Sequence, residues 1–118
     1  MSASLPPSAF ELLRDQYALR LPASLDELTG PAAGTVDLPL HVAWSGRRSY
    51  GLGQPRSQMS LYRTVLAEGQ RQDLITFLDR GLLIAQWPVL RTLTSRPLRD
   101  AWENRFPELP TDKATAAA

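Results

Sequence analysis

Arginine is the residue type in this sequence with the clearest chemical potential. Nine arginines and three acids lie between Arg47 and Arg99, a local charge of +6, whereas the whole chain carries only +1. Residues 1–46 carry two arginines against five acids, and residues 100–118 carry two bases against four acids. A guanidinium group binds phosphate or carboxylate through paired N–H donors. The uneven distribution predicts a basic surface that contacts something negative.

Three segments supply the arginines that we expect to bind. A glycine-bearing loop over 46–53 holds two of them, a helix predicted over 55–68 holds two that are seven residues apart and share a face, and the last helix begins with two more. The loop lacks the lysine and the serine or threonine that close a phosphate-binding loop, and no clear strand precedes it. The predicted binding residues, for a partner or a nucleic acid, are Arg47, Arg48, Arg56, Arg63, Arg96 and Arg99.

Other residue types offer little catalytic chemistry. The chain has no cysteine, which excludes disulfides, zinc ribbons and thiol nucleophiles. Its single histidine, His41, lies among apolar residues, and we interpret it as structural because a general base needs an orienting partner. Asp73 and Asp79 are six residues apart on a helix and do not share a face. We therefore expect no enzyme activity, no cofactor and no metal site.

The size and composition are typical of one globular domain. The chain has 118 residues, of which 43% are hydrophobic and 21% are charged. Its N-terminus has neither a basic region nor an apolar run, and no apolar stretch approaches the ~20 residues that span a bilayer. We expect a soluble cytoplasmic protein without a signal peptide or a membrane segment.

The spacing of apolar residues and helix-ending signals predicts an all-α fold. Ser8 and Ser24 are predicted N-caps, and Pro88 is expected to end or kink a helix. The predicted helices cover 9–19, a short segment from Ser24 to Gly30, 55–68, 71–80, 82–87, 89–93 and 95–106. The fold class is a compact orthogonal bundle of five to seven short helices. Residues 1–106 form one helical domain, and 107–118 form a flexible C-terminal tail.

The segment 36–44 has two interpretations. Val36, Leu38, Leu40 and Val42 alternate with other residues, as in a strand. Asp37 followed by Leu38 and Pro39 also fits the capped start of a short helix. A lone strand has no obvious partner here, so we favour the helix and keep a short strand as the alternative. Of the three tryptophans, at least two are expected in the core.

Three blocks in the stretch from Leu38 to Leu109 support a resemblance. The blocks are LPLHVAWSG at 38–46, MSLYRTVLAEG at 59–69 and QWPVLRTL at 86–93. In sequence and spacing they resemble a family of small uncharacterised actinobacterial proteins, members of which look like upstream partners of abortive-infection nucleotidyltransferase toxins. One departure is Gln54, a poorer N-cap than the acid that many relatives place before the following proline. The resemblance implies an antitoxin-like or accessory binding protein, and it carries over no catalytic residues.

Two functions follow from these observations. The first is a non-catalytic binding protein that contacts a nucleotidyltransferase-type toxin through its basic central surface. The alternative is a DNA-binding regulator with a helix-turn-helix-like arrangement, in which Ser95, Arg96 and Arg99 face the DNA. Asp100 and Glu103 would then repel phosphates, and the pI of 8.2 is below the ~9 typical of strong DNA binders.

Overall fold

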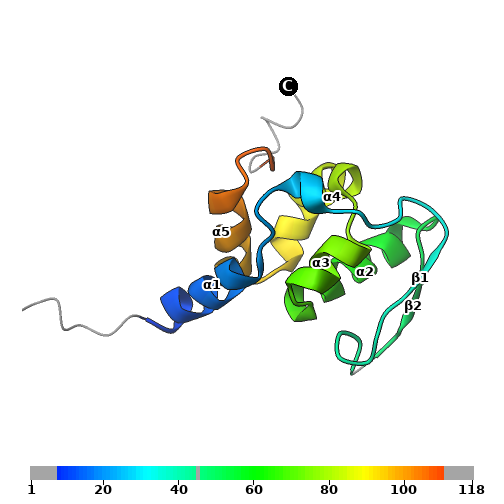
Figure 1. Cartoon of the computed structure of the whole chain (residues 1–118), viewed down its shortest axis with the longest axis horizontal. Helices are drawn as coiled ribbons and strands as arrows, with labels where there is room; N and C mark the ends of the chain where they lie inside the picture. The colour runs from blue at the N-terminus through cyan, green and yellow to red at the C-terminus, as the bar shows by residue number, and fades with distance from the viewer. Residues whose placement is uncertain (1–7, 45, 111–118) are drawn as a thin grey trace, which may run out of the picture.

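The computed structural model describes residues 8–44 and 46–110, and most of them lie in helices (Figure 1). A small two-stranded sheet completes the regular structure. In chain order the elements are α1 (Ala9–Arg20), the 3-10 helix η2 (Leu25–Glu27), β1 (Thr35–Asp37), β2 (Ser49–Gly51), α2 (Pro55–Glu68), α3 (Arg71–Phe77), α4 (Arg80–Leu93) and α5 (Arg96–Arg105). The prediction of a mainly helical protein is confirmed.

The first helices begin where the sequence predicts. Ser8 Oγ accepts from the Glu11 backbone N–H at 3.2 Å, and Glu11 accepts from the Ser8 backbone N–H at 3.0 Å, so a complete capping box opens α1. Ser24 caps η2 through Asp26, while α2 begins at Pro55 without a side-chain cap from Gln54. The weak capping expected of Gln54 is therefore confirmed.

Residues 35–51 form a β-hairpin, so the short helix favoured for 36–44 is wrong and the alternative of a short strand is confirmed in part. β1 pairs antiparallel with β2, with Val36 opposite Tyr50 and both side chains buried. The rest of the predicted segment is a turn, in which Val42 and Ala43 both donate to the Pro39 carbonyl at 3.0 Å. The partner strand β2 lies in the segment 46–53 that was predicted as a loop. Its glycines and arginines leave no clear alternation of apolar and polar residues from which to predict a strand.

The boundaries of α3 and α4 also differ from the prediction. The helix expected over 71–80 ends at Phe77, and Asp79 instead caps α4 by accepting from the Leu82 N–H at 2.9 Å. α4 then continues through Pro88, so the helix end predicted there is wrong. Leu83, Trp87 and Leu90 form a buried stripe on both sides of the proline. The free energy gained by burying that stripe exceeds the cost of the one backbone hydrogen bond that proline removes.

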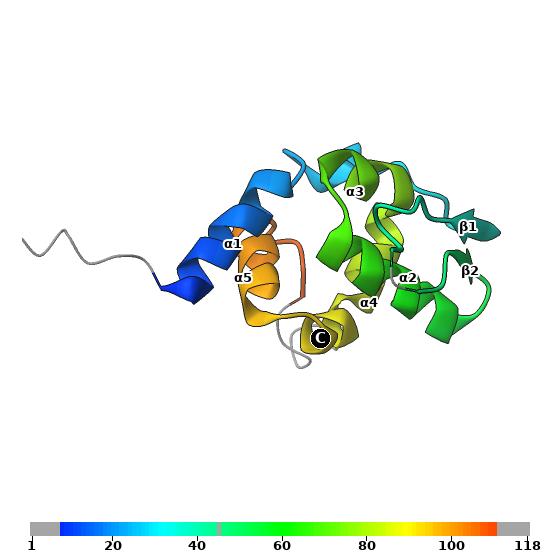
Figure 2. The ribbon, with the colours of Figure 1, turned by 90° about the horizontal axis from the view of Figure 1, so that it is seen from below.

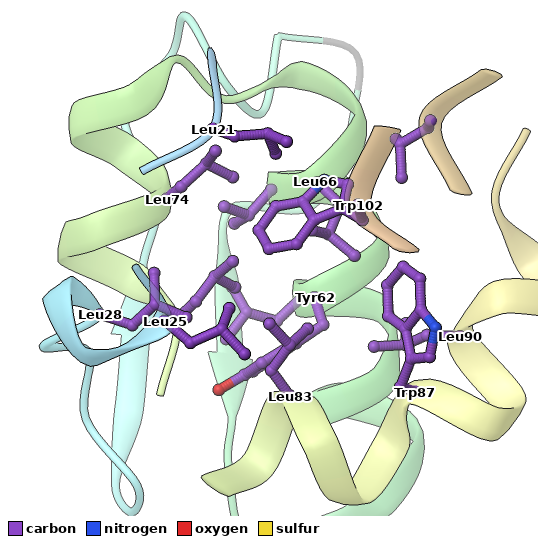
Figure 3. Packing of buried hydrophobic residues seen from close by; sticks show 14 of the residues in the cluster. Leu21, Leu25, Leu28, Tyr62, Leu66, Leu74, Leu83, Trp87, Leu90 and Trp102 are labelled. Carbon is purple, nitrogen blue, oxygen red and sulfur yellow. The ribbon is translucent and has the colours of Figure 1, made fainter. Parts of the chain in front are cut away.

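Two tryptophans lie at the centre of the core, as predicted (Figure 3). The rings of Trp87 and Trp102 are 6.2 Å apart between centroids, and Trp102 is 5.4 Å from Phe106. Leu25, Leu28 and other leucines from the N-terminal segment pack into the same cluster. The third tryptophan, Trp44, is 69% exposed.

The C-terminal part of the described chain packs on the core. Leu109 is 2% exposed and belongs to the core cluster, so the predicted tail boundary at Pro107 lies too early. Residues 111–118 of the predicted tail lie outside the described residues. In the described part, no helix combines the length and apolar character that crossing a membrane requires.

α1 packs along α5, far from the hairpin (Figure 2). The two helices run in the same direction, since Phe10 lies near Arg96 at their first turns and Leu21 lines a hollow with Arg105 at their ends. α1 thus covers part of α5, whose Leu98, Ala101 and Trp102 are buried.

Candidate binding cleft

Two of the predicted binding arginines meet at one cleft. Arg47 from the β1–β2 loop and Arg63 from α2 line a hollow of ≈ 350 Å³, which we call the basin, and an adjoining hollow of ≈ 260 Å³, which we call the arginine lobe. Tyr50 and Thr64 line both hollows. The basin and the arginine lobe together are the arginine cleft. It lies between the hairpin, α2 and the junction of α4 with α5.

The Arg47 side chain is held in place by three contacts. Its Nε donates to the Ser49 carbonyl at 2.7 Å, and its Nη2 donates to Oγ of the buried Ser57 at 2.9 Å. The guanidinium also lies over the Tyr50 ring, 5.0 Å from the centroid. Two of its five N–H donors are used, which leaves three for an incoming anion.

The hairpin explains why this loop has a defined shape. Tyr50 is buried opposite Val36, and its hydroxyl donates to the Arg47 carbonyl at 2.8 Å. Leu38 N–H donates to the Arg48 carbonyl at 2.8 Å, which extends the strand pairing beyond β1. The hairpin, together with Ser57, therefore orders both the backbone and the side chain of Arg47. Because this conformational entropy is lost during folding, less of it is lost on binding.

Arg63 and Arg56 lie on the exposed stripe of α2, as their spacing predicts. Ser60 lies between them on the same stripe and lines the arginine lobe with Arg63. Among residues 8–44 and 46–110, the arginine–carboxylate pairs within 4 Å involve Arg14, Arg80 and Arg91. Neither Arg47 nor Arg63 is paired with an acid of the described chain.

The basin has a different character from the arginine lobe. Val42, Ala43 and Leu98 are buried residues that line it, and Leu93, the last residue of α4, is 44% exposed at its surface. Glu68 also lines the basin and accepts from Trp44 Nε1 at 3.3 Å. The arginine lobe contains no acid among its lining residues. The arginine lobe is therefore basic, while the basin combines the same two arginines with apolar residues and one acid.

Like Arg56, the remaining three candidate arginines do not line the arginine cleft. Arg48 donates to the Leu38 carbonyl at 3.2 Å, and Arg99 donates to the Arg91 carbonyl at 3.1 Å in the last turn of α4. Arg96 lies over the Phe10 ring at 5.8 Å. Arg20 and Arg71 likewise donate to carbonyls in the last turns of α2 and α1, respectively. Arg20, Arg71 and Arg99 thus each bind a carbonyl in the last turn of a helix.

A contact between His41 and Asp73 was missed by the sequence reasoning. His41 Nε2 lies 3.0 Å from both Asp73 carboxylate oxygens, and Asp73 also accepts from the Gln70 N–H at 2.8 Å. The two residues are 32 positions apart, and no local pattern links them. No hydroxyl group of the described residues hydrogen-bonds to His41. The contact joins the 39–44 turn to α3, which supports the structural interpretation of this histidine, although its side chain is 59% exposed.

A partly buried ion pair joins α4 to α5. Glu103 Oε2 accepts from Arg91 Nε at 2.6 Å and from Trp87 Nε1 at 2.8 Å. The three side chains satisfy one another beside the tryptophan cluster. Arg91 and Glu103 therefore have a structural role: they connect α4 to α5.

The described residues contain no group of three or more His, Asp or Glu side chains placed to hold a metal ion. The arginine cleft is the candidate site because two arginines without an acidic partner in the described residues line it. Comparison of the chain with protein-family models, curated proteins and solved structures found no match.

Proposed function

We propose that this chain is a non-catalytic binding protein whose arginine cleft docks a carboxylate-bearing surface of a protein partner. The observation that carries the proposal is the convergence of Arg47 and Arg63, neither of them paired with an acid, on one hollow. Guanidinium groups bind carboxylates through paired hydrogen bonds, and an arginine that is already ordered loses less entropy on binding. Arg56 extends the basic stripe along α2.

The sequence resemblance supports a particular partner class. Relatives of the kind that the three sequence blocks resemble look like partners of nucleotidyltransferase-type toxins. We propose an antitoxin-like or accessory role, in which the arginine cleft meets an acidic surface such as the carboxylate-rich metal site of a nucleotidyltransferase. This role requires binding and no chemistry.

The DNA-binding alternative has less support. A recognition helix needs an exposed face to enter the major groove. α5, which would be the reader, has its core side buried and another side covered by α1. Arg99 donates to a carbonyl, and Arg96 lies over an aromatic ring. We therefore favour a protein partner.

The test is co-expression with the product of the adjacent gene, followed by size-exclusion chromatography at micromolar concentration. A single peak that contains both proteins is expected, and the double variant Arg47→Ala/Arg63→Ala should separate them. Arg105→Ala is the matched control, because this exposed arginine lines a different hollow. Separate elution of the wild-type proteins would refute the proposed function.

A further inference from the structure

The arginine cleft has an apolar side that the proposed role of its arginines does not use. Trp44 is 69% exposed and hydrogen-bonds to Glu68, which lines the basin. Leu93 is 44% exposed and lines the basin directly. Single exposed apolar residues are common on protein surfaces. Here, however, Leu93 lines a hollow whose lining also includes the buried Val42 and Leu98, and Trp44 contacts that hollow only through Glu68.

The charges in the cleft divide it into two parts. Arg47 and Arg63 line both hollows, whereas Glu68 lines only the basin and the arginine lobe has no acidic lining residue. An incoming anionic group is therefore favoured in the arginine lobe over the part of the basin beside Glu68. Away from the arginines, the basin offers the apolar surface of Leu93 and of the buried Val42 and Leu98, against which an apolar group gains free energy from burial.

This division distinguishes between two classes of partner. A nucleic-acid strand carries a charge on every nucleotide, so a strand that follows the cleft would place phosphates beside Glu68. A peptide can place a carboxylate at one position and a large apolar side chain close to it. Tryptophan and arginine are also the residue types that contribute most at protein interfaces.

We infer that the arginine cleft binds a peptide segment in which aspartate or glutamate lies next to a large apolar residue. The carboxylate binds Arg47 and Arg63 in the arginine lobe, and the apolar side chain enters the basin beside Leu93. This inference rests on the proposed function and specifies the partner segment that the cleft selects.

Selection from a displayed library of random peptides tests the inference. The immobilised full chain should enrich peptides that carry an acid beside leucine, isoleucine, phenylalanine or tryptophan. Synthetic copies of the enriched peptides should bind the Arg47→Ala/Arg63→Ala and Leu93→Ala variants at least about tenfold more weakly than the wild type. Arg105→Ala should bind like the wild type, and circular dichroism should show that every variant is folded.

Three outcomes would overturn the inference. They are enrichment of peptides without acids, equal binding by the double arginine variant, and tighter binding of a short single-stranded oligonucleotide than of any selected peptide. Failure to enrich any peptide, with an intact complex between this chain and the adjacent gene product, would overturn the inference and leave the proposed function standing. Loss of that complex would instead remove the proposed function.

Discussion

Arg47 and Ser57 are joined by a 2.9 Å hydrogen bond between a guanidinium at the surface and a buried hydroxyl. Ser57 lies in the first turn of α2, so this bond connects the β1–β2 loop to the helix that carries Arg63. It fixes the position of one basic group of the arginine cleft relative to the other. Ser57 is therefore part of the site, because it positions Arg47 although it does not itself line the cleft.

Replacement of Ser57 by alanine should weaken partner binding without removing any charge. Arg47 would lose one of its anchors and sample more conformations, and we expect about a threefold to tenfold loss of affinity, or about 1 kcal/mol. The same change should add nothing in an Arg47→Ala background. Titration calorimetry of the four variants measures this coupling. Thr76→Ala is the control, because Thr76 is exposed on α3 and does not line the cleft. Additive losses would show that Ser57 acts independently of Arg47.

Removal of either cleft arginine should weaken the complex more strongly. Arg47→Ala and Arg63→Ala should each reduce affinity by about tenfold to one hundredfold, because each leaves a partner carboxylate with fewer donors. Arg56→Ala should have a smaller effect, since Arg56 does not line the cleft. The wild-type affinity should also fall as salt is added. Binding curves that are insensitive to salt and to both substitutions would place the interface elsewhere.

Glu103 should contribute to stability rather than to binding. It accepts hydrogen bonds from Arg91 and Trp87, and Glu103→Ala would leave both donors beside the core without this acceptor. We expect a decrease of about 3 kcal/mol in the free energy of unfolding. Glu103→Gln should cost less, because its side-chain oxygen can still accept from Trp87. Urea denaturation measures the effect, and the exposed Glu108 provides the alanine control. Equal stability of the two alanine variants would contradict the assignment.

Gly30 should tolerate no side chain. A Cβ at this position would lie 2.4 Å from the carbonyl carbon of Phe77 and 2.5 Å from the amide nitrogen of Leu78. The backbones are held together here by the bond from Gly30 N–H to the Leu78 carbonyl at 2.8 Å. Gly30→Ala should therefore reduce the free energy of unfolding by about 3 kcal/mol. Gly53→Ala is the control, since a Cβ there meets nothing within 4 Å. Similar melting temperatures for the two variants would disprove the close approach.

Tyr62 should make the fold sensitive to alkaline pH. Burial of its hydroxyl is the main cause that raises the pKa of Tyr62 from 10.0 to about 12, and the nearby Asp79 charge adds to the shift. The Asp79 backbone N–H, which donates to that hydroxyl at 2.8 Å, acts in the opposite direction. The unfolded chain loses the proton first, so the free energy of unfolding should fall as the pH rises from about 10 to about 12.

The loss should amount to about 2 kcal/mol and should be complete above the folded-state pKa. Denaturation of the wild type and of Tyr62→Phe across this pH range measures it. The phenylalanine variant cannot ionise at this position, so the difference between the two curves isolates the tyrosine. Parallel curves would mean that the hydroxyl does not ionise differently in the folded and unfolded chains.

The local sequence determined the positions of several helices. Ser8 with Glu11 predicts the start of α1, and Pro55 predicts the start of α2, because these signals act within one turn of the chain. The spacing of Arg56 and Arg63 likewise places both on one face, since the helical repeat fixes it. Two buried tryptophans follow from the general cost of exposing large apolar surfaces.

Tertiary structure decided what short-range patterns leave open. Residues 36–44 became a strand and a turn because a distant segment, Ser49–Gly51, supplies the partner strand. α4 passes through Pro88 because its buried stripe packs on the core from both sides. Among the six candidate arginines, only contacts between distant elements distinguish Arg47 and Arg63, which line the cleft, from Arg99, which binds a helix-end carbonyl. Charge is a property of the sequence, but the groups that surround each charge are set by packing.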